Sequence, residues 1–216
     1  IGITTTTYTA ANLTSTTQYR VVVKNGGSCA VNSTIGTVTV TPTLTAASVL
    51  PNSGQSICAN GSGTLLTITD TGGGAITHQW GKRAVSGGTI TNISGATGST
   101  YTPTGVDLTP GTWFVVCTST PACGSPIISN EVQVVVNAIP AAPTVGPIVQ
   151  PSCTVNIGSV LLTGLPVSGT LNPGNITYSG TSYTVNGLSS GTYYYTVSNG
   201  TCSSLSSAAV SINATT

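Results

Sequence analysis

Side chains that could carry out acid–base, nucleophilic or metal chemistry are few in this sequence. The acids are Asp70, Asp107 and Glu131, and the one histidine is His78. Paired-carboxylate hydrolysis needs two acids at one site, and a calcium loop needs several at close spacing, but these three acids are far apart in the sequence. We therefore expect each acid to be a solvated turn or strand residue, and we expect no enzyme activity, no metal and no cofactor.

A cysteine activated by histidine is the nucleophilic arrangement to weigh, with Cys117 and His78 as its members. A thiol becomes a good nucleophile when positive neighbours lower its pKa. The chain has four Lys and Arg residues in total, and none adjoins Cys117 in the sequence. We expect Cys117 to be a buried free thiol that packs as a small hydrophobic residue, and His78 to pack on the same strand face as Trp80.

Composition indicates the fold class and argues against two kinds of partner. Charged residues make up 3% of the 216 residues, where about 25% is usual, whereas 38% are hydrophobic. Thr, Val and Tyr favour strands, so we expect an all-β fold with a packed core. Four basic residues against three acidic ones leave no basic surface for nucleic acid. No apolar run approaches the roughly 20 residues of a membrane span, so none is expected.

One structural unit occurs three times in the sequence. Each copy has a short Tyr-Thr strand, a leucine, a tight turn, an alternating strand entered by an aromatic residue, a cysteine in a loop and a closing Val-rich strand. The copies occupy residues 7–40, 100–136 and 182–212. Repetition at this spacing is typical of small domains in tandem.

Front halves precede only the second and third copies. Strand patterns at 64–68 and 76–80 stand before the second copy, and the pattern at 159–163 stands before the third. The third copy is shorter between its two halves and has no counterpart to Trp80. The first copy has nothing to supply the opening strands of a domain, so its strand edges would stay unpaired.

Pro-rich joints separate the units and are typical of short, stiff linkers. The sequence predicts a back half with E-, F- and G-like strands in residues 1–42, a complete domain in 43–138 and a shorter domain in 139–216. We expect chain that precedes this sequence in a longer protein to complete the back half. Completion by strands from a neighbouring subunit is the alternative.

Strand periodicity assigns the aromatic residues to two faces. The residues expected on the core face are Tyr19, Trp80, Trp113 and Tyr193. Phe114 and Tyr194 have the opposite parity, so we expect them to be exposed. They are the aromatic candidates for contact with a glycan or a protein.

The six cysteines follow the repeat, and spaced cysteines in small β domains are typical of oxidising compartments. Three occupy equivalent loop positions after the aromatic residue of each copy: Cys29, Cys123 and Cys202. Cys58 and Cys153 are also equivalent, because each stands just before the first strand of a front half. We therefore predict the bridges Cys58–Cys123 and Cys153–Cys202, with Cys29 and Cys117 unpaired in this chain. A Cys117–Cys123 bridge is the alternative, although it would break the equivalence of the copies.

The segments 95–103 (GATGSTYTP) and 119–125 (STPACGS) look like the immunoglobulin-like and PKD-like repeats of giant surface proteins of the Bacteroidota. The leucine, turn and aromatic entry also resembles the corner at the start of strand F in immunoglobulin-like domains. This resemblance implies tandem immunoglobulin-like antiparallel β-sandwich domains. It also implies export by the type IX secretion system and a place on the bacterial cell surface.

The function implied by this resemblance is structural or adhesive. The modules would form a stalk or adhesin whose partners are neighbouring modules, like subunits, glycans or other surface ligands. Two alternatives stay open: a subunit of a self-assembled extracellular filament completed by strand addition, and accessory carbohydrate-binding modules of a secreted glycoside hydrolase.

Overall fold

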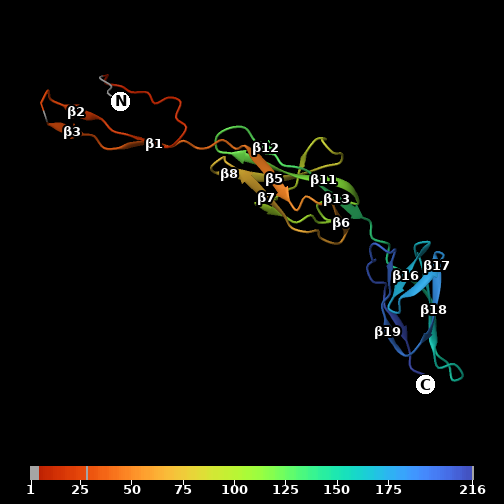
Figure 1. The fold of residues 1–216 in the computed structure, drawn as a ribbon. Coiled ribbons are helices and arrows are strands. Elements are labelled where there is room, and N and C mark those ends of the chain that lie inside the picture. The colour runs from red at the N-terminus through yellow and green to blue at the C-terminus, as the bar shows by residue number, and fades with distance from the viewer. Residues whose placement is uncertain (1–4, 28, 216) are drawn as a thin grey trace.

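The computed structural model describes residues 5–27 and 29–215, and every regular element in them is a β-strand. The predicted all-β class is therefore confirmed. Figure 1 shows three parts that follow one another along the chain: a hairpin at the N-terminal end and two β-sandwiches. Among the described residues, no helix has the length and apolar character needed to cross a membrane.

The N-terminal hairpin (17–38) is built from four short strands. They are β1 (Thr17–Tyr19), β2 (Val22–Lys24), β3 (Ala30–Asn32) and β4 (Gly36–Val38). β1 pairs with β4 and β2 pairs with β3, both antiparallel. The predicted strand at 7–9 does not form; the Tyr8 ring instead lies 5.3 Å from that of Tyr19. The reason is that this part contains no front-half strand with which segment 7–9 could pair.

The middle sandwich (46–137) has two sheets. One contains β10 (Thr100–Tyr101), β7 (Leu66–Thr71) and β5 (Ala46–Leu50), in that order. The other runs in the order β6 (Gln55–Cys58), β13 (Val132–Asn137), β11 (Gly111–Pro121), β8 (Ile76–Arg83) and β9 (Thr91–Asn92), with β12 (Ile127–Ile128) also paired to β11. All pairs are antiparallel except that of β6 with β13, which is parallel.

Alternation along the strands fills the space between these sheets. On β13, Val132 and Val134 are fully buried while Gln133 between them is exposed. Trp80 from β8 is also fully buried, and its ring lies 5.6 Å from that of Tyr101 on the opposite sheet. This core is separate from that of the next sandwich.

The C-terminal sandwich (144–212) is smaller. One sheet contains β14 (Thr144–Val149), β15 (Gly158–Thr163) and β18 (Ser182–Leu188). The remaining strands are β16 (Ser168–Asn172) between β17 (Ile176–Ser179) and β20 (Thr196–Ser198), and β19 (Gly191–Tyr193) paired with β21 (Val210–Ile212). Its core has no tryptophan, and the buried Tyr178 and Tyr195 supply the aromatic bulk.

A serine joins the same two strands in every unit. In the middle sandwich, Ser129 Oγ accepts the Cys117 N–H at 2.9 Å, and the Ser129 N–H donates to the Cys117 carbonyl at 2.9 Å. The Ser129 hydroxyl then donates to the Asn130 carbonyl at 2.8 Å. The same three bonds link Val21 with Ser33 and Tyr195 with Ser207. We call this arrangement the serine bridge.

The serine bridge corrects the alignment of the copies. Counted from the aromatic residue of each copy, Cys117 would match Val23 and Val197. Counted from the serine, it matches Val21 and Tyr195, because each of these residues lies 12 positions before its serine. The longer β11 accounts for the difference, since it has two extra residues between Trp113 and the bridge.

Removing the bridge from one sandwich should destabilise that sandwich alone. Ser129→Ala leaves the buried Cys117 N–H without its acceptor, which we expect to lower the free energy of unfolding by about 1–3 kcal/mol. Both tryptophans belong to the middle sandwich, so tryptophan fluorescence during denaturant unfolding reports on it specifically.

Ser207→Ala is the matched control, because it removes the same bridge from the other sandwich. The tryptophan-detected midpoint should stay at its wild-type value in that variant. An equal shift in both variants would contradict a local role for the bridge.

Candidate functional site

Acid, imidazole and hydroxyl groups meet inside the middle sandwich. Asp70 Oδ2 on β7 lies 2.7 Å from His78 Nε2 on β8, so the pair joins the two sheets. Ser119 on β11 stands opposite His78 in the strand pairing. These are the residue types of a hydrolase triad, but Ser119 is fully buried, so no substrate reaches its hydroxyl. The Asp70–His78 pair acts as a polar link between the sheets.

Cys117 lies beside this cluster and is fully buried in the core. Burial, aided by the negative charge of Asp70, raises the pKa of its thiol to about 12. A nucleophilic cysteine needs the opposite shift. The thiol is therefore protonated at neutral pH and packs as an apolar group.

The other two acids hold loops in place, so the prediction that each acid is merely solvated is wrong. Asp107 accepts hydrogen bonds from Tyr101 Oη at 3.1 Å and Thr104 Oγ1 at 2.9 Å. Burial and this carboxylate together raise the pKa of Tyr101.

Glu131 ties the loop after β8 to the segment just before β13. It accepts from Ser86 Oγ at 2.6 Å and from the Gly87 N–H at 2.9 Å, and it pairs with Arg83. The Ser86 bond first, then the Gly87 N–H and Arg83, lower the pKa of Glu131. Both carboxylates accept hydrogen bonds from nearby loop residues and so hold these loops in place.

The aromatic residues expected in the core have three different environments. Trp80 is fully buried and donates its indole N–H to the Gly98 carbonyl at 2.9 Å. Trp113 and Tyr193 pack at the edges of the two cores and donate to carbonyls four residues upstream, at 2.7 and 2.9 Å. Tyr19 is half-buried against Tyr8 and belongs to neither core.

The two aromatic residues expected at the surface differ from each other. Tyr194 is 57% exposed, whereas Phe114 is half-buried, so the expectation for Phe114 is wrong. Phe114 lies on a strand paired on both sides, opposite Arg83 and Gln133, and these neighbours restrict its access to solvent.

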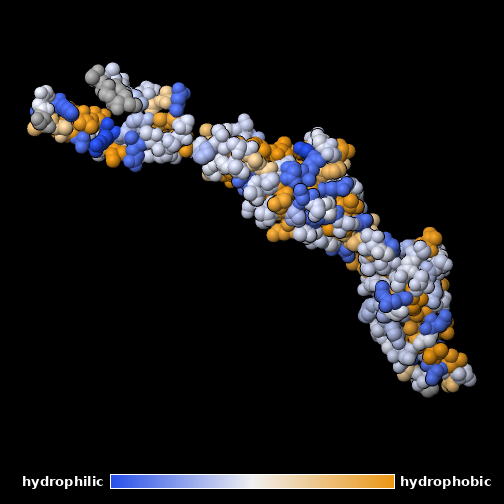
Figure 2. Space-filling view, in the orientation of Figure 1, coloured by the Kyte–Doolittle hydropathy of each residue, from blue (hydrophilic) through white to orange (hydrophobic). Residues whose placement is uncertain are grey.

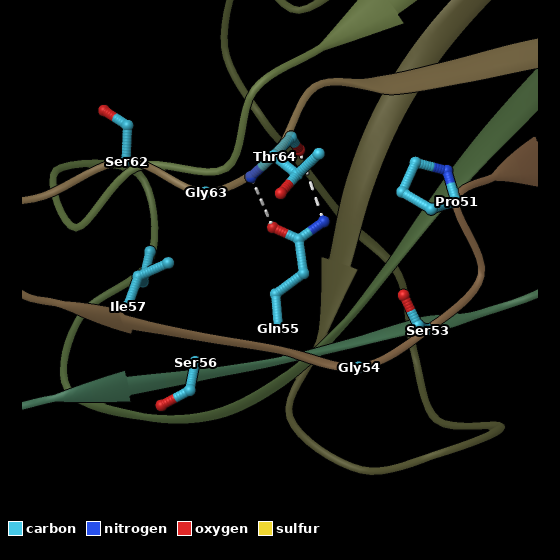
Figure 3. A pocket seen from close by; sticks show the side chains of 9 residues that line it. All are labelled: Pro51, Ser53, Gly54, Gln55, Ser56, Ile57, Ser62, Gly63 and Thr64. Atoms are coloured by element: carbon cyan, nitrogen blue, oxygen red, sulfur yellow. Dashed lines mark hydrogen bonds between the residues drawn. The ribbon is translucent and has the colours of Figure 1, made fainter.

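A hollow of about 370 Å³ lies on the middle sandwich, beside β6. Its lining consists of Pro51, Ser53, Gly54, Gln55, Ser56, Ile57, Ser62, Gly63 and Thr64 (Figure 3). The Gln55 amide spans it, accepting the Thr64 N–H at 2.8 Å and donating to the Thr64 carbonyl at 3.2 Å. A Cβ on Gly63 would lie 2.2 Å from Gln55 Oε1, so a larger residue there would displace the Gln55 amide. The lining has no charged or aromatic side chain and offers only neutral hydrogen bonds.

The disulfide of the structure joins Cys58 to Cys202, with their Cα atoms 5.8 Å apart. The predicted bridges Cys58–Cys123 and Cys153–Cys202 are therefore wrong, because the pairing crosses from one sandwich to the next. Cys58 ends β6, which runs parallel to β13 and pairs with Asn137, where the chain leaves the middle sandwich. Cys202 lies in the loop after β20, at the entry of the C-terminal sandwich.

Strand direction explains why Cys58 does not reach Cys123. Gly111 on β11 lies at the Cys58 end of the sheet, and Cys123 follows Pro121 at the other end of that strand. Ten residues of strand separate the two ends by about 33 Å. A disulfide needs Cα atoms within about 7 Å. Equivalent sequence positions placed Cys58 and Cys202 among the bridged cysteines, but only the strand directions tell which ends meet.

Three of the other cysteines occupy the same two kinds of position. Cys29 and Cys123 are exposed in hairpin loops that correspond to the loop of Cys202. Cys153 is exposed between β14 and β15, in the position that corresponds to Cys58. Among the described residues, no group of three or more His, Cys, Asp or Glu side chains is arranged to hold a metal ion.

Two sandwiches in tandem with a covalent link across their joint define a modular β-sandwich protein. A family model described as a domain of unknown function, DUF8696, matches residues 1–42 and 48–138, which is more than half of the chain. The chain belongs to this family. No curated protein matches the sequence.

Among solved structures, the chain is similar to several tandem-domain proteins. The FN1–FN3 domains of chicken CNTN1 share 12% identity, with a TM-score of 0.38, covering 92% of this chain and 75% of that one. The fibronectin(III)-like modules of Clostridium thermocellum CbhA share 16%, with a TM-score of 0.32, covering 77% and 94%. The four N-terminal Ig domains of Dscam1 isoform 6.9 share 15%, with a TM-score of 0.36, covering 79% and 46%. At these TM-scores the likenesses carry no argument about function.

The difference between buried and exposed thiols should appear in their alkylation. At pH 8, iodoacetamide should label Cys29 and Cys123 in the folded, non-reduced chain of 216 residues, because both are exposed. Cys117 should react at least roughly 100-fold more slowly, since it is buried and its pKa is raised to about 12. Mass spectrometry of the digested protein measures each site.

Unfolding in denaturant at the same pH is the control and should bring Cys117 to the rate of the exposed thiols. Labelling of Cys117 in the folded chain as fast as Cys123 would show that the core is open at this point.

Proposed function

We propose that this chain is part of an extended, noncatalytic array of β-sandwich modules that serves as a stalk or adhesin outside the cell. The observation that carries the proposal is the Cys58–Cys202 bridge across the joint between two sandwiches. A covalent link between consecutive modules fixes their relative position. It is useful where the relative position of modules must survive load or proteolysis.

The position of the bridge determines how a pulling force passes through the molecule. The two cysteines are 144 residues apart, so most of both sandwiches lies inside the covalent loop that they close. Tension applied at the chain ends passes directly from Cys58 to Cys202. The strands inside the loop are shielded, and only the segments before Cys58 and after Cys202 carry the load.

The proposed compartment is extracellular. Disulfide-bonded small domains are typical of oxidising environments, and this chain has a bridge and further exposed cysteines. A chain with 3% charged residues also has little electrostatic repulsion between neighbouring copies. Attachment to a bacterial surface through the type IX system rests on the sequence resemblance alone. Tyr194 is the aromatic candidate for an adhesive contact.

A filament subunit is the second candidate function, and the N-terminal hairpin favours it. Figure 2 shows hydrophobic surface along this part of the molecule. The side chains of Val21 and Val38 are 62% and 42% exposed, whereas Cys117 and Val134, which hold the equivalent places in the middle sandwich, are fully buried. Strands supplied by a like subunit would cover this face.

Force spectroscopy tests the stalk function. When the oxidised chain is pulled by its ends, the unfolding trace should contain no contour length from the residues between Cys58 and Cys202. Reductant should release it as about 500 Å of additional contour length, since 144 residues are freed. Cys58→Ser is the control and should show this length without reductant. Its release from the oxidised wild-type chain would contradict load transfer through the bridge.

Sedimentation tests the filament function. A filament subunit should form polymers as its concentration rises, and Val21→Ser combined with Val38→Ser should suppress them by making the hairpin polar. Both side chains are exposed, so the substitutions should leave the two sandwiches folded. A wild-type chain that stays monomeric up to high micromolar concentration would exclude the filament function.

A further inference from the structure

We propose that the Cys58–Cys202 bridge is one link of a repeating series. In this series, the cysteine near the chain exit of one module bonds to the hairpin-loop cysteine of the module that follows it. The partner of Cys123 is then a cysteine equivalent to Cys58 in a module of the same fold placed before the middle sandwich. Cys29 has the same kind of partner one module earlier. This inference rests on the proposed function as a modular array.

The hairpin-loop cysteines all lie in the loop of a serine-bridged hairpin, four to six residues before its serine. Cys202 lies five residues before Ser207, Cys123 six before Ser129 and Cys29 four before Ser33. Each therefore lies in the loop of a hairpin whose pairing is fixed by the same three hydrogen bonds. That loop stands at the entry end of a module. For Cys202, this is where the preceding module supplies Cys58.

The exit-end cysteines are equivalent in their surroundings as well. The Ala59 N–H donates to the Asn137 carbonyl at 2.9 Å, which holds the Cys58 segment against the end of β13. In the C-terminal sandwich, Gln150 donates to the Ser211 carbonyl and accepts the Asn213 N–H, at 2.9 and 2.8 Å. These bonds hold the segment that leads to Cys153 against the end of β21. Cys153 thus stands where a following module would present its hairpin loop.

The N-terminal hairpin indicates which kind of module lies next to Cys123. Figure 1 places β12, at the Cys123 end of the middle sandwich, toward this hairpin. The hairpin has the serine-bridged pairing of a module's last two strands. Val21 is 62% exposed, although its counterpart Tyr195 is 1% exposed. The front half that would bury Val21 is the part of a module that carries the exit-end cysteine.

Bond formation in this series is a two-electron oxidation. Two thiols lose two protons and two electrons as the sulfur–sulfur bond forms, and the disulfide of a thiol oxidoreductase takes them up and becomes a dithiol. The module that supplies the partner thiol belongs to the same polypeptide or to another copy. The chemistry is identical in the two cases, and only the size of the product differs.

Thiol mapping of the native polypeptide tests the proposal. Cells are lysed in N-ethylmaleimide, and the protein is digested without reduction and analysed by mass spectrometry. We expect a Cys58–Cys202 peptide pair and a Cys123 peptide bonded to the cysteine equivalent to Cys58 in another module. In the recombinant chain of 216 residues, Cys123 should carry the maleimide, because that module is absent. Cys117→Ser should leave both maps unchanged.

Each other outcome overturns the proposal. A Cys123 that carries maleimide in the native polypeptide, or that is bonded to Cys117 or to Cys153 of the same copy, excludes the series. Electrophoresis without reductant distinguishes the two sources of the partner, since only a bond between copies adds mass. If Cys123 has no partner in another module but force spectroscopy still shows a shielded loop, the series is excluded. The Cys58–Cys202 bridge and the stalk function are then retained.

Discussion

A serine hydroxyl that accepts a backbone N–H from the neighbouring strand fixes the same step in the pairing of three hairpins. After Ser129 in the sequence, Val132 pairs with Val115, and before it Ile128 pairs with Thr118. The pairing register of the two strands therefore shifts by one residue at the serine bridge. The shift would leave the Cys117 N–H buried without an acceptor, and the serine supplies one. The rest of each sandwich is arranged around this hairpin.

The small number of charged side chains is the second constraint on the fold. With seven formally charged side chains in 216 residues, stability depends on backbone pairing and apolar burial. The three acids are correspondingly engaged inside the middle sandwich, where Asp70 links the sheets and Asp107 and Glu131 hold loops. The residues that looked most suitable for chemistry therefore have structural roles in the middle sandwich.

Much of the fold could be predicted from sequence because strand periodicity is a local property. The patterns at 64–68, 76–80 and 159–163 correspond to β7, β8 and β15, and Trp80 is fully buried. The errors came from properties that are not local. The expected strand at 7–9 lacks a partner to pair with. The half-buried position of Phe114 depends on the strands on either side of it.

The candidate site shows the same division. The repeat positions sort the cysteines into two equivalent groups. Their pairing, however, depends on which strand ends meet, and this follows from the parallel pairing of β6 with β13. Counting from the aromatic residue matches Cys117 to the wrong positions of the other copies, because β11 has two additional residues. An addition of two residues keeps the alternation of the strand, so the strand pattern does not reveal it. The recurring serine 12 residues after a strand position was a signal in the sequence for this alignment.

The parallel pair of β6 and β13 has a further consequence for how the molecule withstands cleavage of its backbone. It places Cys58 at the very point where the polypeptide departs for the next sandwich, so the covalent loop encloses the Pro-rich joint at 139–143. A hydrolytic cut in that joint would leave the two sandwiches tethered by the disulfide. The part after the cut would stay attached until the disulfide was reduced, so a single cut in the joint would not separate the two sandwiches.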